Sequence, residues 1–341
     1  MPLLTTQKWG RVGALIAAAL LFLAVSASGQ ANPAFWKLEW PRTDFSKSNV
    51  PLDEIFSGGV PKDGIPPIYE PRFAPIAEVD RLYQGTEPVI TVAINGEARA
   101  YPLGILMTHE IVNDELGGMS IAVTYCPLCN SAVVFDRNVN GRIHTFGVSG
   151  KLRHSDLVMW DHETESWWQQ FTGEAIVGAQ AGAMLRALPA RLESLTRFRA
   201  RAPRGWVMIS ADVMQQPYGE TPYFGTDALW DTQSPNLVHE RYPSDLPDTV
   251  SPLTRVVVVG DRAWSLDHLR TFGRVETDGL ILTWQPGQNS IHDSAWIPAG
   301  RDVGNIVVQK IAADGTLRDV VYDVTFVFAF RNFRPDGEIT F

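Results

Sequence analysis

The sequence contains little cysteine and little positive charge. Its 341 residues include two cysteines, Cys126 and Cys129, and 29 lysines and arginines against 38 aspartates and glutamates, a formal net charge of −9. A four-thiolate metal site is excluded, because two sulfurs supply only half of a tetrahedral ligand set. The acidic balance also offers a phosphate backbone no attractive surface, so we expect no nucleic-acid partner.

Long apolar runs are missing beyond the first thirty residues. That opening segment combines Lys8 and Arg11 with an apolar run from Val12 to Val25 and then small residues up to Ala27. This pattern is typical of a secretory signal peptide, and we expect it to span residues 1–27. The alternative is an uncleaved anchor, but the run is shorter than the roughly 20 residues that cross a bilayer. We therefore predict a periplasmic or extracellular protein whose mature chain has no transmembrane span.

Several common catalytic motifs are also missing. The sequence has no glycine-rich phosphate loop, no nucleophile elbow and no His-Glu-x-x-His segment. A standard kinase or hydrolase is therefore excluded, and the sequence by itself assigns no enzymatic activity.

The pattern of the remaining chain predicts an α+β fold that is predominantly β. Residues 28–87 are rich in proline, glycine and polar turns, which indicates an extended N-terminal strap. A β-type run at 89–94 then meets Asn95-Gly96, a strong hairpin signal. Helical spacing follows at 103–111, and strands are expected at 120–125 and 131–136.

An echo between the two halves predicts an internal duplication. The segment 96–103 (GEARAYPL) returns, one residue shorter, at 260–266 (GDRAWSL), and 124–131 (TYCPLCNS) returns at 283–290 (TWQPGQNS). Two anchors in the same order favour a repeated β-rich unit. We predict a first unit at 88–250 that carries the Cys-Pro-Leu-Cys motif. A second, cysteine-free unit would follow at 251–341, with Gln285 and Gln288 in the same turn.

The Cys126–Cys129 pair allows two kinds of chemistry. In an exported chain, two cysteines would ordinarily form a disulfide, as a structural staple or as a redox pair. A thioredoxin-like pair opens a helix, however, whereas residues 131–135 here read as a strand. A Cys-Pro-x-Cys turn between strands is the shape of a metal-binding knuckle, for which copper and zinc are the candidate ions.

A metal at this knuckle needs further ligands. The candidate ligands are His109, His154, Met159 and His162. Of these we select His109 and Met159, since an imidazole and a thioether beside two thiolates suit copper or zinc. A short connection should also pack the helical stretch of His109 beside the strand that leads to Cys126. Arg153, Asp156 and Gln169 are expected to line the same site as cofactor-binding residues.

Four segments together resemble the bacterial and archaeal domain-of-unknown-function family 3179. They are residues 124–129 (TYCPLC), 146–152 (FGVSGKL), 156–161 (DLVMWD) and 168–175 (WQQFTGEA), and the resemblance extends from about Val50 to the end of the chain. The resemblance implies an exported setting but no established activity. Relatives often have glycine after the second cysteine, where this chain has Asn130, which also tolerates a left-handed backbone.

These observations leave three functional hypotheses. The first is an exported metal-binding protein with Cys126, Cys129, His109 and Met159 as ligands. The second is a thiol-disulfide redox protein. The third is a non-enzymatic module stapled by a Cys126–Cys129 disulfide.

Overall fold

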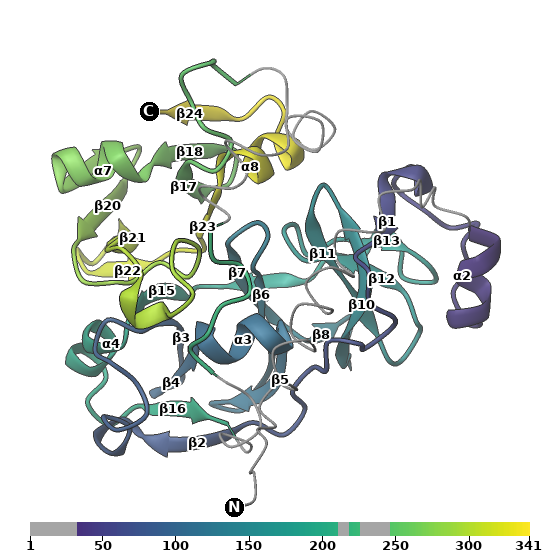
Figure 1. Ribbon diagram of the computed structural model, residues 1–341, viewed down its shortest axis with the longest axis horizontal. Helices are drawn as coiled ribbons and strands as arrows, with labels where there is room; N and C mark the ends of the chain where they lie inside the picture. The colour runs from purple at the N-terminus through teal and green to yellow at the C-terminus, as the bar shows by residue number, and fades with distance from the viewer. Residues whose placement is uncertain (1–32, 211–217, 226–245) are drawn as a thin grey trace, which may run out of the picture.

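The computed structural model describes residues 33–210, 218–225 and 246–341, and the predicted signal peptide lies outside these ranges. The fold is predominantly β, as the sequence predicts: within the described ranges there are five sheets of four or five strands and one two-stranded ribbon (Figure 1). None of the helices in these ranges has the length and apolar character needed to cross a bilayer.

The first unit begins where the predicted hairpin lies. Asn95 and Gly96 both have positive φ, at 50° and 86°, and connect β3 to β4. The elements are β3 (Pro88–Ile94), β4 (Glu97–Pro102), α3 (Leu103–His109), β5 (Ile111–Leu116), β6 (Met119–Cys126), β7 (Ser131–Asp136), β14 (Arg186–Leu188), β15 (Arg191–Ser194), α4 (Leu195–Arg201) and β16 (Trp206–Ile209). They form two sheets, ordered β14-β7-β6-β5 and β15-β3-β4-β16, the latter extended by β2.

The second unit repeats this order of elements. It comprises β17 (Arg255–Val259), β18 (Arg262–Ser265), α7 (Leu266–Phe272), β19 (Arg274–Thr277), β20 (Leu280–Gln285), β21 (Asn305–Ile311), β22 (Leu317–Asp319), β23 (Asp323–Phe326), α8 (Val327–Phe333) and β24 (Glu338–Thr340). Its sheets run β22-β21-β20-β19 and β23-β17-β18-β24, strand for strand as in the first unit. The last strand of each second sheet is parallel to its neighbour in both copies. The predicted duplication is confirmed.

Equivalent backbone hydrogen bonds support the same correspondence. Tyr125 N–H donates to Glu110 O at 2.8 Å, and Trp284 N–H donates to Gly273 O at 2.9 Å. Glu110 and Gly273 each end a helix with positive φ, 58° and 68°. This explains why the first helix ends at His109 and not at residue 111 as predicted. The two units also share one hydrophobic core, in which Tyr101 and Trp264 belong to a single cluster.

The prediction that both copies keep the cysteine turn is wrong. Cys126 pairs with Ser131 across the tight turn 127–130, whereas Gln285 pairs with Asn305 across residues 286–304. This longer loop includes η3 (Ile297–Ala299). The structural similarity of the two segments therefore ends with the strand. After Gln285 the chain forms a long loop before the next strand, whereas after Cys126 it forms a four-residue turn.

A further sheet interrupts the first unit and has no counterpart in the second. It lies beside β6 and β7 (Figure 1). The two-stranded ribbon that precedes it consists of β8 (Asn138–Val139) and β9 (Arg142–Ile143). The strands of the sheet itself are β10 (Phe146–Arg153), β11 (Asp156–Asp161), β12 (Trp167–Gln169) and β13 (Ala175–Val177). The order β1-β10-β11-β12-β13 shows that the N-terminal segment supplies its edge strand. We call residues 138–177 the inserted sheet.

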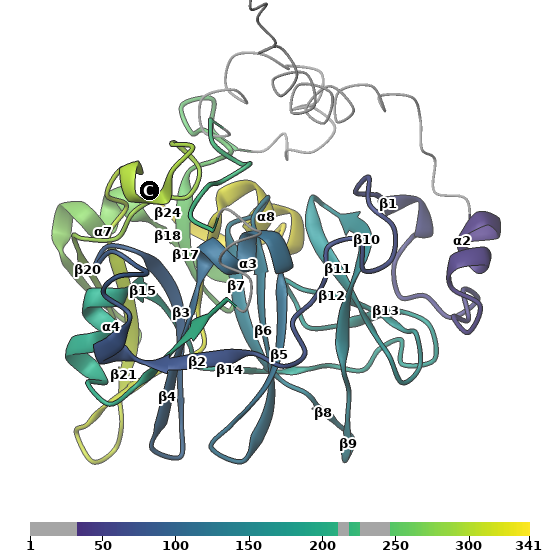
Figure 2. The same cartoon turned by 60° about the horizontal axis from the view of Figure 1, so that its bottom comes forward.

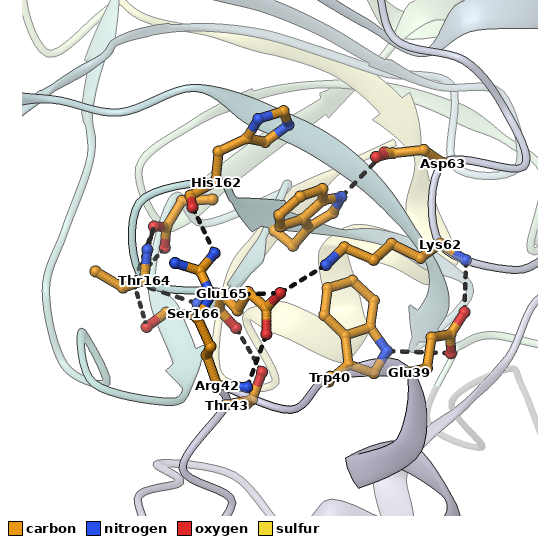
Figure 3. Close-up of polar contacts among 12 residues, drawn as sticks. Glu39, Trp40, Arg42, Thr43, Lys62, Asp63, His162, Thr164, Glu165 and Ser166 are labelled. Carbon is orange, nitrogen blue, oxygen red and sulfur yellow. Dashed lines mark hydrogen bonds and ion pairs between the residues drawn. The ribbon is translucent and has the colours of Figure 1, made fainter.

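The N-terminal segment runs as a strap across the other sheets (Figure 2). Its elements are α2 (Pro33–Glu39), η1 (Leu52–Glu54), β1 (Ile55–Ser57), β2 (Arg72–Pro75) and η2 (Ile76–Glu78). Lys62 fastens the strap to the inserted sheet: its Nζ lies 3.7 Å from the Trp160 ring centroid and 4.3 Å from that of Trp40. The same ammonium donates to Glu165 at 2.9 Å (Figure 3). Cation–π and ion-pair contacts thus hold the strap in place.

The duplication predicts matched effects of two glycine substitutions. A Cβ at Gly205 would lie 2.5 Å from Cζ of Phe198, and a Cβ at Gly337 would clash with the same ring atom of Phe330. Gly205→Ala and Gly337→Ala should each lower the free energy of unfolding by about 1–3 kcal/mol through overpacking. Denaturant titration measures this, with Ala313→Ser in an exposed turn as a neutral control. A destabilisation in only one copy would contradict the structural equivalence.

Candidate functional site

Three buried side chains from two separate sheets meet at the cysteine motif. The ligand atoms of Cys126, Cys129 and Asp156 all lie within 4.8 Å of one another, and all three residues are buried. Cys126 ends β6, Cys129 lies in the turn before β7, and Asp156 opens β11 of the inserted sheet. Both cysteines are free thiols. A tetrahedral metal with bonds of about 2.0–2.3 Å separates its ligands by less than this limit, so the cluster is compatible with one ion.

The turn that carries the cysteines depends on Asn130. Its φ is 54°, so the prediction that asparagine replaces glycine in a left-handed conformation is confirmed. Its side chain is held on both sides, because Tyr125 Oη donates to Oδ1 at 3.0 Å and Nδ2 donates to Val324 O at 2.9 Å. Asp323 also accepts a hydrogen bond from Ser131 Oγ at 2.6 Å. The second unit therefore fixes the shape of the knuckle.

A two-residue hairpin turn delivers Asp156 to the sulfurs. His154 and Ser155 both have positive φ, 54° and 62°, the conformation of a type I′ turn. The turn points the carbonyl of Ser155 at the knuckle, 3.2 Å from Cys129 Sγ and 3.7 Å from Cys126 Sγ. Asp156 follows directly, so the turn sets the positions of both oxygens.

Asp156 is only partly satisfied by its protein neighbours. Its Oδ2 accepts hydrogen bonds from Gln169 Nε2 at 2.6 Å and from Phe171 N at 2.9 Å. Its Oδ1 is buried and has no partner with hydrogen-bond geometry, although the Cys126 thiol lies close enough to this carboxyl to lower its pKa. Ser155 Oγ and Gln169 Oε1 are also buried without partners. Buried polar atoms nearly always have partners, so an unpaired Asp156 oxygen beside two sulfurs favours a further group at this point.

The site brings together acidic groups whose pKa values are raised by burial. Burial raises the pKa of Asp156 to about 7 and raises the pKa of both thiols. Burial, with the nearby charge of Asp156, also raises the pKa of Glu110 to about 8. Such groups ionise readily only when a cation offsets their charge. The arrangement therefore favours a metal ion as the missing group.

The structure does not bring His109 into this group. Its Nδ1 is hydrogen-bonded to Pro66 O at 2.7 Å and its Nε2 to Tyr218 Oη at 3.1 Å, so both ring nitrogens have other partners. The three-residue cluster found among the described residues contains Asp156 instead. The short connection does pack α3 against β6, but Glu110, with its positive φ, is the helix-end residue whose charge acts on Cys126.

The other predicted residues divide between the site and its surroundings. Gln169 contacts Asp156 directly, as expected for a residue that lines the site. Arg153 is bound by Glu54, with Nε to Oε2 at 2.7 Å, and Met159 packs in the apolar cluster that also contains both cysteines. The remaining histidine candidates lie elsewhere: His154 Nε2 lies 3.6 Å from Glu54 Oε2, and His162 Nε2 is hydrogen-bonded to Tyr69 Oη at 2.9 Å.

Sequence reasoning missed two contributions to the site. Asp156 was assigned to the wall and not to the ligand set, and the Ser155 carbonyl was not considered. A usable signal was present, since an aspartate at a strand start that is otherwise apolar (DLVMW) must be buried with a partner.

Comparison with known proteins places the chain in a family without adding an activity. No curated protein and no solved structure matches the chain. A family model described as "Protein of unknown function (DUF3179)" matches residues 62–337, which include the knuckle, the inserted sheet and nearly all of the second unit. The chain therefore belongs to the DUF3179 family of proteins of unknown function.

Proposed function

We propose that this protein binds a metal ion at Cys126, Cys129 and Asp156. The observation that carries the proposal is the Asp156 Oδ1 atom, which is buried without a hydrogen-bond partner inside a group whose ligand atoms lie within 4.8 Å. A cation at this position would satisfy the carboxylate and would let both thiols ionise as ligands.

The donor set favours zinc over copper. Two thiolates alone suit either ion, but a carboxylate oxygen is a hard ligand that zinc accepts and that copper(I) disfavours. Three protein ligands leave one position of a tetrahedron. Ser155 precedes Asp156 in the chain and Gln169 is hydrogen-bonded to it, and each has a buried oxygen without a partner, so these residues are the candidates for a neutral fourth donor.

Burial favours a resident ion over one that exchanges freely. Cys126 and Cys129 have side chains that are 2% and 0% exposed, and Asp156 is fully buried. An ion held there is shielded from chelators until the inserted sheet and the knuckle separate. This geometry supports a structural or storage role.

The same electrostatics weigh against the thiol-disulfide alternative. A redox-active cysteine needs a lowered thiol pKa and access to its partner. Here burial raises the pKa of Cys126 and Cys129, and the charge of Asp156 acts in the same direction. We propose export separately, on the N-terminal sequence pattern alone.

Substitution of the ligands tests the proposal. Three substitutions nearly preserve side-chain volume: Cys126→Ser, Cys129→Ser and Asp156→Asn. Each should weaken zinc affinity by more than about 100-fold, because replacing a residue that only hydrogen-bonds a metal ligand already lowers metal affinity by about 10–100-fold. The zinc content per chain, after each protein is refolded and dialysed to equilibrium in a zinc buffer of fixed free concentration, measures this. His109→Ala and Met159→Leu serve as controls, and both should keep affinity close to that of the unsubstituted protein. Loss of zinc in His109→Ala together with retention in Asp156→Asn would reverse the assignment.

The oxidation state of the pair gives an independent test. Protein purified without an affinity tag and unfolded in denaturant without reductant should release one zinc ion and expose two thiols per chain, since the metal keeps both cysteines reduced. A thiol reagent and a metal indicator read the two quantities together. Absence of both thiols until reductant is added would instead establish the disulfide.

A further inference from the structure

A second candidate site lies in the first unit, at the opposite end of α3 from Glu110. It is a cavity of about 590 Å³. Its wall includes Tyr83 and Glu87 from the segment before β3, Gly104 from the first turn of α3, and Tyr218 and Trp296. None of these residues belongs to the cysteine cluster, so the cavity is independent of the proposed metal site.

Glu87 is the unusual member of this wall. It is only 5% exposed, and its carboxyl accepts a hydrogen bond from the backbone N–H of Gly104. Within the described part of the chain, no basic side chain forms an ion pair with it. A buried carboxylate without a counter-ion is costly, so its retention calls for an explanation.

The duplication shows that this acid is specific to one copy. Leu195 N–H donates to Glu87 O in the first unit, and Val327 N–H donates to Thr254 O in the second, so Thr254 occupies the equivalent position. Gly104 makes room for the longer side chain, because a Cβ there would lie 3.0 Å from Glu87 Oε1. The repeated fold therefore does not require a carboxyl at the position of Glu87, since the second unit has Thr254 there.

Three aromatic residues line the same cavity as Glu87: Tyr83, Tyr218 and Trp296. The Tyr83 hydroxyl donates to Met208 O at 3.0 Å, and the Tyr218 hydroxyl is hydrogen-bonded to His109 Nε2 at 3.1 Å. Burial and the charge of Glu87 raise the pKa of Tyr83, which places the carboxyl close to that ring. Trp296 is 52% exposed at the rim. An acid in a cavity lined by aromatic residues matches the chemistry of an organic cation, which aromatic rings attract through their quadrupoles.

We propose that this cavity binds an organic amine as its ammonium ion, with Glu87 as the counter-ion and Tyr83, Tyr218 and Trp296 as the aromatic wall. The ammonium supplies the charge that the buried carboxylate lacks, and the alkyl or aryl part of the amine fills the remaining volume. The carboxylate anchors the cation, so neutral and anionic analogues of the same shape bind more weakly.

Affinity for the amine should rise with pH across neutrality. Burial raises the pKa of Glu87 to about 7, and only the ionised carboxylate pairs with an ammonium. Binding therefore strengthens between about pH 6 and pH 8, where the amine is still protonated. The other charged groups of the wall are Asp80, which is paired with Arg199, and Arg81. Behind the wall, His109 is hydrogen-bonded to Tyr218.

Calorimetry with 2-phenylethylammonium chloride tests the proposal on the full chain. The uncharged 2-phenylethanol and the anionic 3-phenylpropionate serve as matched probes. The ammonium should bind best, and Glu87→Gln should reduce its affinity about tenfold or more and abolish the pH dependence. Trp296→Ala, at the exposed rim, should reduce affinity severalfold through the lost ring.

Asp80→Asn is the control, because it removes a rim charge without touching the carboxyl of Glu87, and it should change affinity by less than about twofold. Melting curves of each variant without ligand establish that it is folded. If Glu87→Gln unfolds, the affinity of Trp296→Ala for the ammonium is the test of the proposal. Equal binding of the ammonium to Glu87→Gln, equal binding of the alcohol, an unchanged affinity in Trp296→Ala, or no binding to the unsubstituted protein would each overturn the proposal.

Discussion

The contact between the hairpin turn of the inserted sheet and the cysteine knuckle is the constraint on which the site depends. His154 and Ser155 take left-handed backbone conformations, and this tight reversal carries the Ser155 carbonyl to 3.2 Å from Cys129 Sγ. Asp156, the next residue, is thereby buried against two sulfurs with one oxygen unsatisfied. Without the inserted sheet, the knuckle would present two thiols only. With it, a third and charged donor from a different sheet completes a set that suits a divalent cation.

The duplicated frame explains why the site exists in one copy. In the first unit, Cys126 and Ser131 close a tight hairpin, and in the second the equivalent strands are joined by residues 286–304. That longer loop reaches back to the first copy, where His292 Nε2 is hydrogen-bonded to Pro127 O at 2.9 Å. The second unit thus lacks the knuckle and supports the one in the first unit. The same asymmetry appears at Glu87, whose structural equivalent is Thr254.

Local patterns in the sequence were sufficient for the strands, the Asn95-Gly96 hairpin and the repeat, because each depends on neighbouring residues or on ordered anchors. They were insufficient for the ligand set, which joins residues thirty positions apart through packing of two sheets. Spacing suggested His109, since it lies on the helix that packs on β6, but the helix ends in a left-handed residue and the ring turns to Pro66. The inserted sheet was invisible as a separate element, because its strands resemble those on either side.

The identity and number of the atoms around the proposed metal ion are the most direct test of this account. X-ray absorption at the zinc edge, on protein purified without an affinity tag, should show two sulfur ligands at about 2.3 Å and oxygen ligands at about 2.0–2.2 Å, as expected for two thiolates and a carboxylate. Asp156→Asn should alter the oxygen shell and leave the sulfur shell in place. A spectrum with imidazole scattering, with no sulfur, or with no bound metal in a protein whose thiols are intact would contradict the account.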